Sequence, residues 1–216
     1  MRIKIALLVG LCLPAPAWAE CVEVHTSTAP YSVSQGKSVA QIHGMSDIPD
    51  WVPSDAGMAM GNFESQLDVK YDTGDEYIAY SPCGPFSHFD VHISFTNAVI
   101  NIGHEITAHS CMYNAAVAHE LKHYYDYKEA LAASGHGLQA KISSYLQQLP
   151  PSTPESAATD RYNAQVAVNS IVEQYGKDLY AELARRNTLV DTPAESMRVY
   201  GQCPEQITDL RRALGN

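Results

Sequence analysis

Residues 118–123 have the sequence Ala-His-Glu-Leu-Lys-His, with two histidines four residues apart. The surrounding residues 110–131 contain no Pro or Gly, which predicts a helix through this run. At 3.6 residues per turn, His119 and His123 lie one above the other on one helix face. Two imidazoles at this spacing can bind one zinc ion, and Glu120 beside them can act as general base on a water at the metal.

The N-terminus has the pattern of a secretory signal peptide. Two basic residues precede an apolar stretch from Ile5 to Leu13, and Ala17-Trp18-Ala19 is a small-x-small cleavage pattern. The apolar stretch is far shorter than the roughly 20 residues that span a bilayer. We therefore expect residues 1–19 to be removed, and residues 20–216 to be exported to the periplasm or secreted, without a membrane anchor.

Length and charge restrict the class of protein further. The chain has 216 residues and a formal net charge of −10, and it loses two basic residues with the signal. Such a length suits one domain with a proper core. An acidic surface disfavours nucleic acid and anionic membranes as partners, because both would repel it.

The pattern of apolar residues changes from a period of two to a helical period along the chain. Residues 63–71 and 89–95 alternate between apolar and polar, which predicts strands, and a further short strand is expected at 99–102. Helices are expected from residue 110 to a break at Ser134-Gly135-His136-Gly137, and then over 138–149, 160–186 and 192–203, where Pro204 ends the last one. Strands first and helices after predict an α+β fold with a small antiparallel or mixed sheet.

These features together resemble the zincin metallopeptidases, in which a sheet precedes the HExxH helix. Within that family, the chain resembles uncharacterised bacterial proteins described as predicted secreted zinc proteases. The resemblance rests on the export signal, on residues 111–123, and on Asp191-Thr192-Pro193-Ala194-Glu195 followed by Cys203. It implies zinc as cofactor, a protein or peptide as substrate, and an edge strand that pairs with the extended substrate.

The third zinc ligand distinguishes the branches of that family. The metzincin pattern HExxHxxGxxH is absent, since Asp126 and Glu129 occupy the positions of its Gly and last His. The gluzincin type, with a Glu from a later helix, fits better and makes Glu195 the leading candidate. Thr192 to Glu195 is also a capping box, which would explain the same residues without a metal. His136 and Asp191 remain the alternatives.

Four cysteines remain after removal of the signal, and an even number in an exported protein predicts two disulfides. No pair has the CxxC-like spacing of a cysteine zinc site. Cys111 precedes His119 by eight residues and Cys203 follows Glu195 by eight. If the two helices run antiparallel past one metal, both cysteines are displaced about 12 Å toward the same end. This favours the pairs Cys111–Cys203 and Cys21–Cys83.

The sequence thus predicts an exported zinc metallopeptidase with Glu120 as general base and with His119, His123 and Glu195 as zinc ligands. The alternative is a non-catalytic, zinc-stabilised binding protein on the same scaffold. Glu120 argues against it, because a purely structural site has no need of a carboxylate beside the metal.

Overall fold

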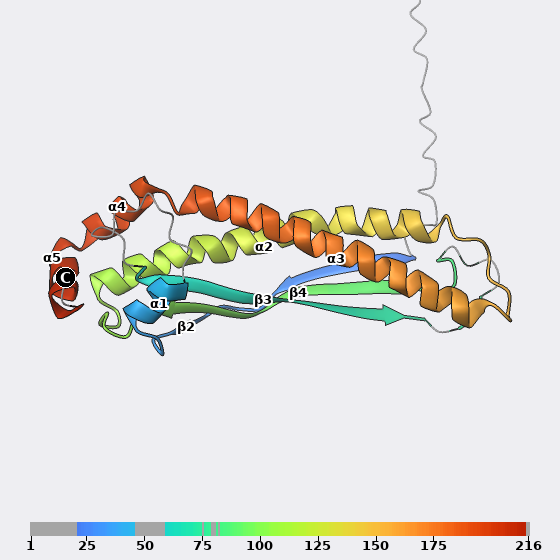
Figure 1. Ribbon diagram of the computed structural model, residues 1–216, viewed down its shortest axis with the longest axis horizontal. Helices are drawn as coiled ribbons and strands as arrows, with labels where there is room; N and C mark the ends of the chain where they lie inside the picture. The colour runs from blue at the N-terminus through green and yellow to red at the C-terminus, as the bar shows by residue number, and fades with distance from the viewer. Residues whose placement is uncertain (1–20, 46–58, 75, 79–80, 82, 215–216) are drawn as a thin grey trace, which may run out of the picture.

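The computed structural model describes residues 21–45, 59–74, 76–78, 81 and 83–214 (Figure 1). The predicted signal peptide lies outside these residues. In chain order the elements are β1 (Val22–Thr28), β2 (Ser32–Ser34), α1 (Val39–Met45), β3 (Gly61–Thr73), β4 (Phe89–Ile102), α2 (Cys111–Leu146), α3 (Ala157–Val190), α4 (Pro193–Gln202) and α5 (Pro204–Leu214). The predicted α+β class is confirmed, although the short helix α1 lies between β2 and β3.

Strand β4 is the centre of a small mixed sheet. On one side it pairs in parallel with β1, from Val22 opposite Phe89, and with β2, from Ser32 opposite Val99. On its other side it pairs with β3 in antiparallel register. The sheet therefore has β3 as one edge, and β1 and β2 together as the other.

The two strands predicted at 89–95 and 99–102 form one continuous strand. Asn97 lies within β4 with a φ of 51°. Asn adopts this left-handed conformation more readily than most residues, so the strand passes through the irregular position without ending. The opposite strand, β3, has a register shift between Glu64 and Gln66 at the same level. On the other side, the pairing of β4 changes there from β1 to β2.

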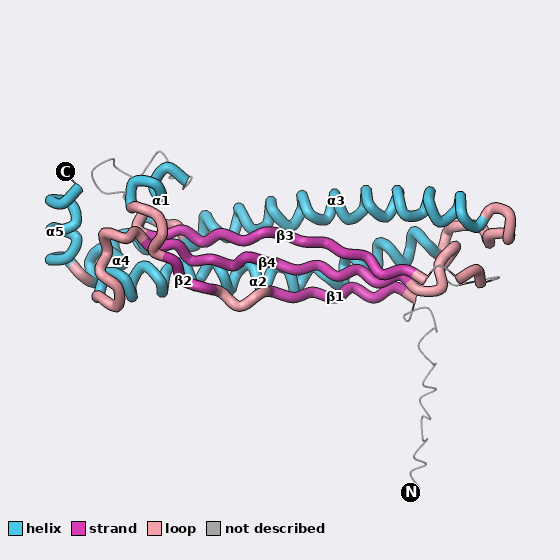
Figure 2. Tube along the Cα trace, turned by 90° about the horizontal axis from the view of Figure 1, so that it is seen from below, coloured by secondary structure: helices cyan, strands magenta, loops and turns pink. Residues whose placement is uncertain are grey.

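Helices α2 and α3 lie on one face of the sheet (Figure 1). Seen from below, the strands lie in front of α2, with α1 at one end (Figure 2). Alternate residues of β4 are buried beneath the helices, as the period-two pattern predicts, and they include Val91, Ile93 and Phe95. Leu131, Leu138 and Ile142 of α2 belong to the same hydrophobic cluster.

Helix α2 is much longer than predicted. It runs for 36 residues, so the break expected at residues 134–137 is wrong. Gly135 is buried, and a Cβ atom at this position would lie 2.9 Å from Cγ2 of Thr26 in β1. The glycine therefore lets the helix approach the sheet closely, and contact with β1 outweighs its low helix propensity.

The C-terminal region contains one helix more than predicted. Pro204 ends α4 as expected, but it is also the first residue of α5. Proline is well tolerated at the first helical position, where its missing N–H has no partner within the helix. Gly176 leaves α3 unbroken from Ala157 to Val190.

Both predicted disulfides are confirmed. Cys21 is bonded to Cys83, and Cys111 is bonded to Cys203. The second bond joins the first residue of α2 to the C-cap of α4. Two disulfides are typical of an oxidising, exported environment.

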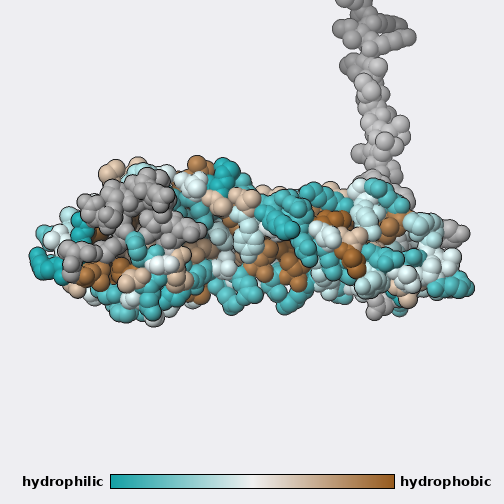
Figure 3. Space-filling view, viewed as in Figure 1, coloured by the Kyte–Doolittle hydropathy of each residue, from teal (hydrophilic) through white to brown (hydrophobic). Residues whose placement is uncertain are grey.

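The surface shown in Figure 3 is mainly hydrophilic, with hydrophobic residues scattered in small groups. Within the described residues, none of the helices has the combination of length and apolar character needed to cross a membrane.

Candidate metal centre

Three side chains meet where α2 passes the end of α3. His119 and His123 lie one turn apart on α2, and Asp191 is the C-cap residue of α3. Oδ1 of Asp191 lies 3.1 Å from Nε2 of His119 and 3.0 Å from Nε2 of His123. The two predicted histidines therefore converge, and the carboxylate between them belongs to Asp191.

The other ring nitrogen of each histidine also has a partner. Nδ1 of His119 lies 3.4 Å from Oε1 of Glu195, and Nδ1 of His123 lies 3.1 Å from Oδ1 of Asn187. An Nδ1–H that donates to such an oxygen leaves the Nε2 lone pair available to a metal. Glu195 and Asn187 thus have the arrangement of residues that orient metal-binding histidines.

The donor set of this group could hold a metal ion. Two imidazole nitrogens and one carboxylate oxygen lie within 4.8 Å of one another. In a tetrahedral site with zinc bonds of 2.0–2.1 Å, donor atoms are about 3.3 Å apart, close to the distances found between Asp191 and both histidines. Three protein ligands of this kind are typical of catalytic zinc sites, which keep a fourth position for water or substrate.

The side chain of Glu120 projects from α2 toward the first residue of β3. It is buried, with 6 % of the residue exposed. The main-chain N–H of Phe63 donates a hydrogen bond to the carboxylate. Burial raises the pKa of Glu120, although the neighbouring His119 and His123 act in the opposite direction. The buried carboxylate therefore holds a proton more readily than an exposed one would.

The three converging side chains also perturb one another. Burial by itself lowers the pKa of both histidines, but their hydrogen bonds to Asp191 and the nearby Glu120 raise it above the ordinary value. Burial opposes the ionisation of Asp191, yet the hydrogen bonds from His119 and His123 hold its pKa well below the usual range. Asp191 therefore shifts the pKa of both histidines, and each histidine shifts the pKa of Asp191.

Glu195 lies four residues beyond Asp191, in the first turn of α4 and outside the group of three. Its carboxylate accepts hydrogen bonds from Arg198, at 2.6 Å and 2.8 Å, and from Lys122 at 2.5 Å. Arg198, followed by Lys122 and His119, holds the pKa of Glu195 well below its usual range, against the effect of burial. The predicted N-cap is also present, since the Thr192 hydroxyl accepts the Glu195 N–H.

His136, the other candidate for the third ligand, lies elsewhere. His136 is on an exposed part of α2, thirteen residues beyond His123, which corresponds to about 20 Å along the helix. Asp126 and Glu129 face Arg186, whose Nη1 lies 4.0 Å and 3.7 Å from their carboxylates. The helix continues through these positions, which agrees with the exclusion of the metzincin pattern.

Asn187 was not among the residues predicted from the sequence. It lies one helical turn before Asp191 on α3, on the same face. Once Asp191 is considered as a ligand, this i, i+4 spacing is the signal that identifies Asn187 as a neighbour of the site.

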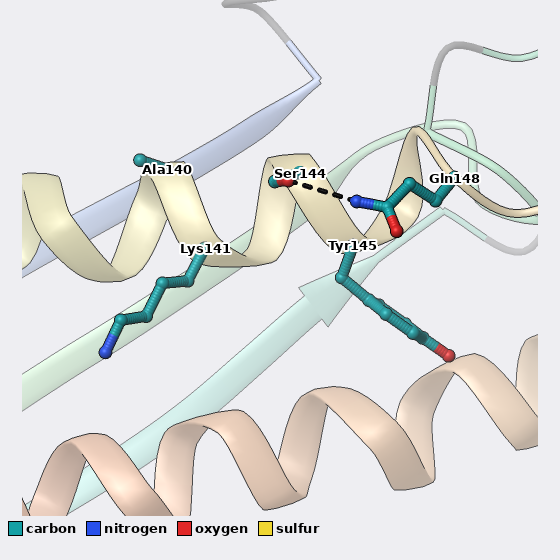
Figure 4. A pocket seen from close by; sticks show the side chains of 5 residues that line it. All are labelled: Ala140, Lys141, Ser144, Tyr145 and Gln148. Carbon is teal, nitrogen blue, oxygen red and sulfur yellow. Dashed lines mark hydrogen bonds between the residues drawn. The ribbon is translucent and has the colours of Figure 1, made fainter.

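Two other features lack the properties of this centre. Asp72, His88 and Asp90 also form a group of ligand-type residues, but the side chains of Asp72 and His88 are 72 % and 45 % exposed. A depression on α2 is lined by Ala140, Lys141, Ser144, Tyr145 and Gln148 (Figure 4). Lys141 is about 27 Å along the helix from His123, so the depression is separate from the histidines.

Comparisons with known proteins give no further assignment. No family model, no curated protein and no solved structure matches the chain.

Proposed function

We propose that the protein is a zinc-dependent peptidase, with zinc held by His119, His123 and Asp191. The observation that carries this proposal is the convergence of both Nε2 atoms on one carboxylate oxygen, at 3.1 Å and 3.0 Å, with the buried Glu120 adjacent. In this proposal Asp191 takes the third-ligand position first assigned to Glu195. Glu195 instead orients His119 from the opposite side of the ring.

Zinc in this position would polarise the carbonyl of a peptide bond and lower the pKa of a water beside it. Glu120 would accept a proton from the attacking water and pass it to the leaving amine. Asn187 and Glu195 would hold the two imidazoles with their Nε2 atoms toward the metal. Exported proteins or peptides are the expected substrates.

The burial of Glu120 favours an enzyme over a zinc-stabilised binding protein. Placing a carboxyl group away from water costs free energy unless it is well paired. Among the described contacts of Glu120 is a main-chain hydrogen bond from Phe63, and no cationic Lys or Arg is among the causes that shift its pKa. A structural zinc site would not require such a group, whereas general acid–base catalysis does.

Glu120→Gln tests the proposal directly. The amide is nearly isosteric but cannot accept a proton at neutral pH, so hydrolysis of an unfolded protein should fall by about 10²–10⁴-fold with zinc retained. Glu129→Gln is a matched control, since Glu129 lies on the same helix with a side chain that is 74 % exposed. A chelator should abolish hydrolysis by wild-type protein. Zinc-free wild-type protein that gains nothing on adding zinc, or full hydrolysis by Glu120→Gln, would overturn the proposal.

A further inference from the structure

The first residue of β3 lies against the Glu120 side chain. A Cβ atom at Gly61 would be 2.9 Å from both Cγ and Oε1 of Glu120, and 3.1 Å from Cδ1 of Ile102. Contacts shorter than 3.0 Å are essentially never made by real Cβ atoms. Any larger residue at position 61 therefore has to displace Glu120.

The main chain of β3 also provides the hydrogen-bond donor. The Met60 carbonyl accepts the Gly103 N–H at 3.1 Å, which makes Met60 and Gly103 a hydrogen-bonded pair. Such pairs alternate along an antiparallel ladder, so the amide of Phe63 points away from β4, toward the free edge of the sheet. This outward N–H is the one that donates to Glu120.

Glu120 has little room to move elsewhere. The residue is buried, and Phe63 packs beside it against Tyr124 and Tyr127 of α2, with ring centroids 6.0 Å and 5.1 Å apart. A displaced carboxylate would lose the Phe63 donor while remaining enclosed by the helix and the strand. The position of this side chain is thus determined by β3 as well as by its own helix.

We propose that Gly61 is a positioning residue for Glu120. The absence of a side chain at position 61 lets the carboxylate lie against the edge of β3, where the Phe63 amide fixes it beside the histidines. The catalytic consequence rests on the proposed peptidase function. The contact itself does not, and it can be tested without any activity.

A double-mutant cycle on the purified full chain tests the contact. Gly61→Ala should lower the thermal midpoint clearly in the wild-type background, and much less in Glu120→Ala, where Cγ and Oε1 are gone. Gly137→Ala is the matched control, because a Cβ there has no neighbour within 4 Å, and its effect should be equal in both backgrounds. Equal shifts for Gly61→Ala in both backgrounds would overturn the proposal, whether or not the protein is a peptidase.

The kinetic arm tests the consequence. Gly61→Ala should bind zinc as wild-type does and keep KM, while kcat falls on the order of 10²-fold, because displacement of a catalytic group by about 1 Å has that effect. Coupling in the stability cycle with an unchanged kcat would refute the positioning role. If wild-type protein shows no hydrolysis, the proposed function fails, and the stability cycle alone decides whether Gly61 positions Glu120.

Discussion

Oδ1 of Asp191 lies 3.0 Å from Nε2 of His123, although 68 residues separate them in the chain. The two residues meet because α3 runs back along α2 in the opposite direction, which brings its C-terminal end beside the HExxH turn (Figure 1). The chain turns into α4 at the same place, so Glu195 in the first turn of α4 contacts the other ring nitrogen of His119.

Substitution of the two carboxylates should separate their roles. Asp191→Ala removes the oxygen that faces both histidines, and we expect zinc affinity to fall by more than 100-fold. Glu195→Gln leaves the proposed ligands in place and should reduce zinc affinity by about 10–100-fold at most, as for other residues that orient a ligand. Zinc titration against a competing chelator measures both changes. A larger loss for Glu195→Gln than for Asp191→Ala would assign the third ligand to Glu195.

Asn187 should contribute to zinc binding through His123. Removing its side-chain oxygen in Asn187→Ala leaves the imidazole without its partner on Nδ1, and we expect a 10–100-fold loss of zinc affinity. Asn169→Ala, on the same helix but distant in sequence, is the control. Equal zinc affinities for the two variants would show that Asn187 does not orient the ligand.

The dependence of stability on pH should reverse when zinc binds. In protein without zinc, folding raises the pKa of His119 and His123, so their protonated forms stabilise the fold. This stabilisation is complete below the unfolded pKa of about 6.5 and is lost as pH rises through the pKa of the folded state. The lowered pKa of Asp191 gives stability that is present above about pH 4 and is lost as pH falls.

The thermal midpoint of chelated protein should therefore be highest between about pH 4 and 6.5. Zinc requires neutral histidines, so the rise in midpoint on adding zinc should grow with pH. Thermal scans from pH 4 to 8, with and without zinc, measure both trends. A zinc effect that is constant over this range would contradict His119 and His123 as ligands.

The two disulfides should differ in their effect on the metal centre. Cys111–Cys203 ties α4 to the start of α2, so that its replacement by alanines should weaken zinc binding as well as the fold. Cys21–Cys83 lies near the other end of α2, where Gly84 is close to Leu146 and Leu149. Its removal should cost about 2–5 kcal/mol of stability and leave the zinc affinity of the folded protein unchanged. Zinc titration and denaturant unfolding of both variants check this difference.

The glycines of α2 provide a test of its contact with the sheet. Gly137→Ala should stabilise the protein by up to about 1 kcal/mol, since helix propensity improves and a Cβ there meets no neighbour. Gly135→Ala gains the same propensity but places Cβ against Thr26 of β1, so it should be less stable than Gly137→Ala. If both variants gain equal stability in denaturant unfolding, α2 does not approach β1 as closely as described.

Local sequence patterns were sufficient for part of this molecule. The i, i+4 spacing of His119 and His123 places them together on any α-helix, because that geometry depends on the helix alone. Alternation at residues 63–71 and 89–95 likewise identifies strands β3 and β4, and alternate residues of β4 are buried. The disulfide pairing also followed from the sequence, since Cys111 and Cys203 lie eight residues from His119 and Glu195 on two helices expected to run antiparallel past each other.

Tertiary packing decided the rest. Gly135 lies within α2 because contact with β1 compensates for its poor helix propensity. The prediction of a helix break used only neighbouring residues in the sequence, which carry no information about that contact. Asp191 and Glu195 are four residues apart, and both reach His119. Which carboxylate faces the two Nε2 atoms depends on where α3 ends relative to α2 and on the direction in which α4 leaves. That arrangement is set by the packing of whole helices against the sheet, a long-range property that spacing along the chain does not specify.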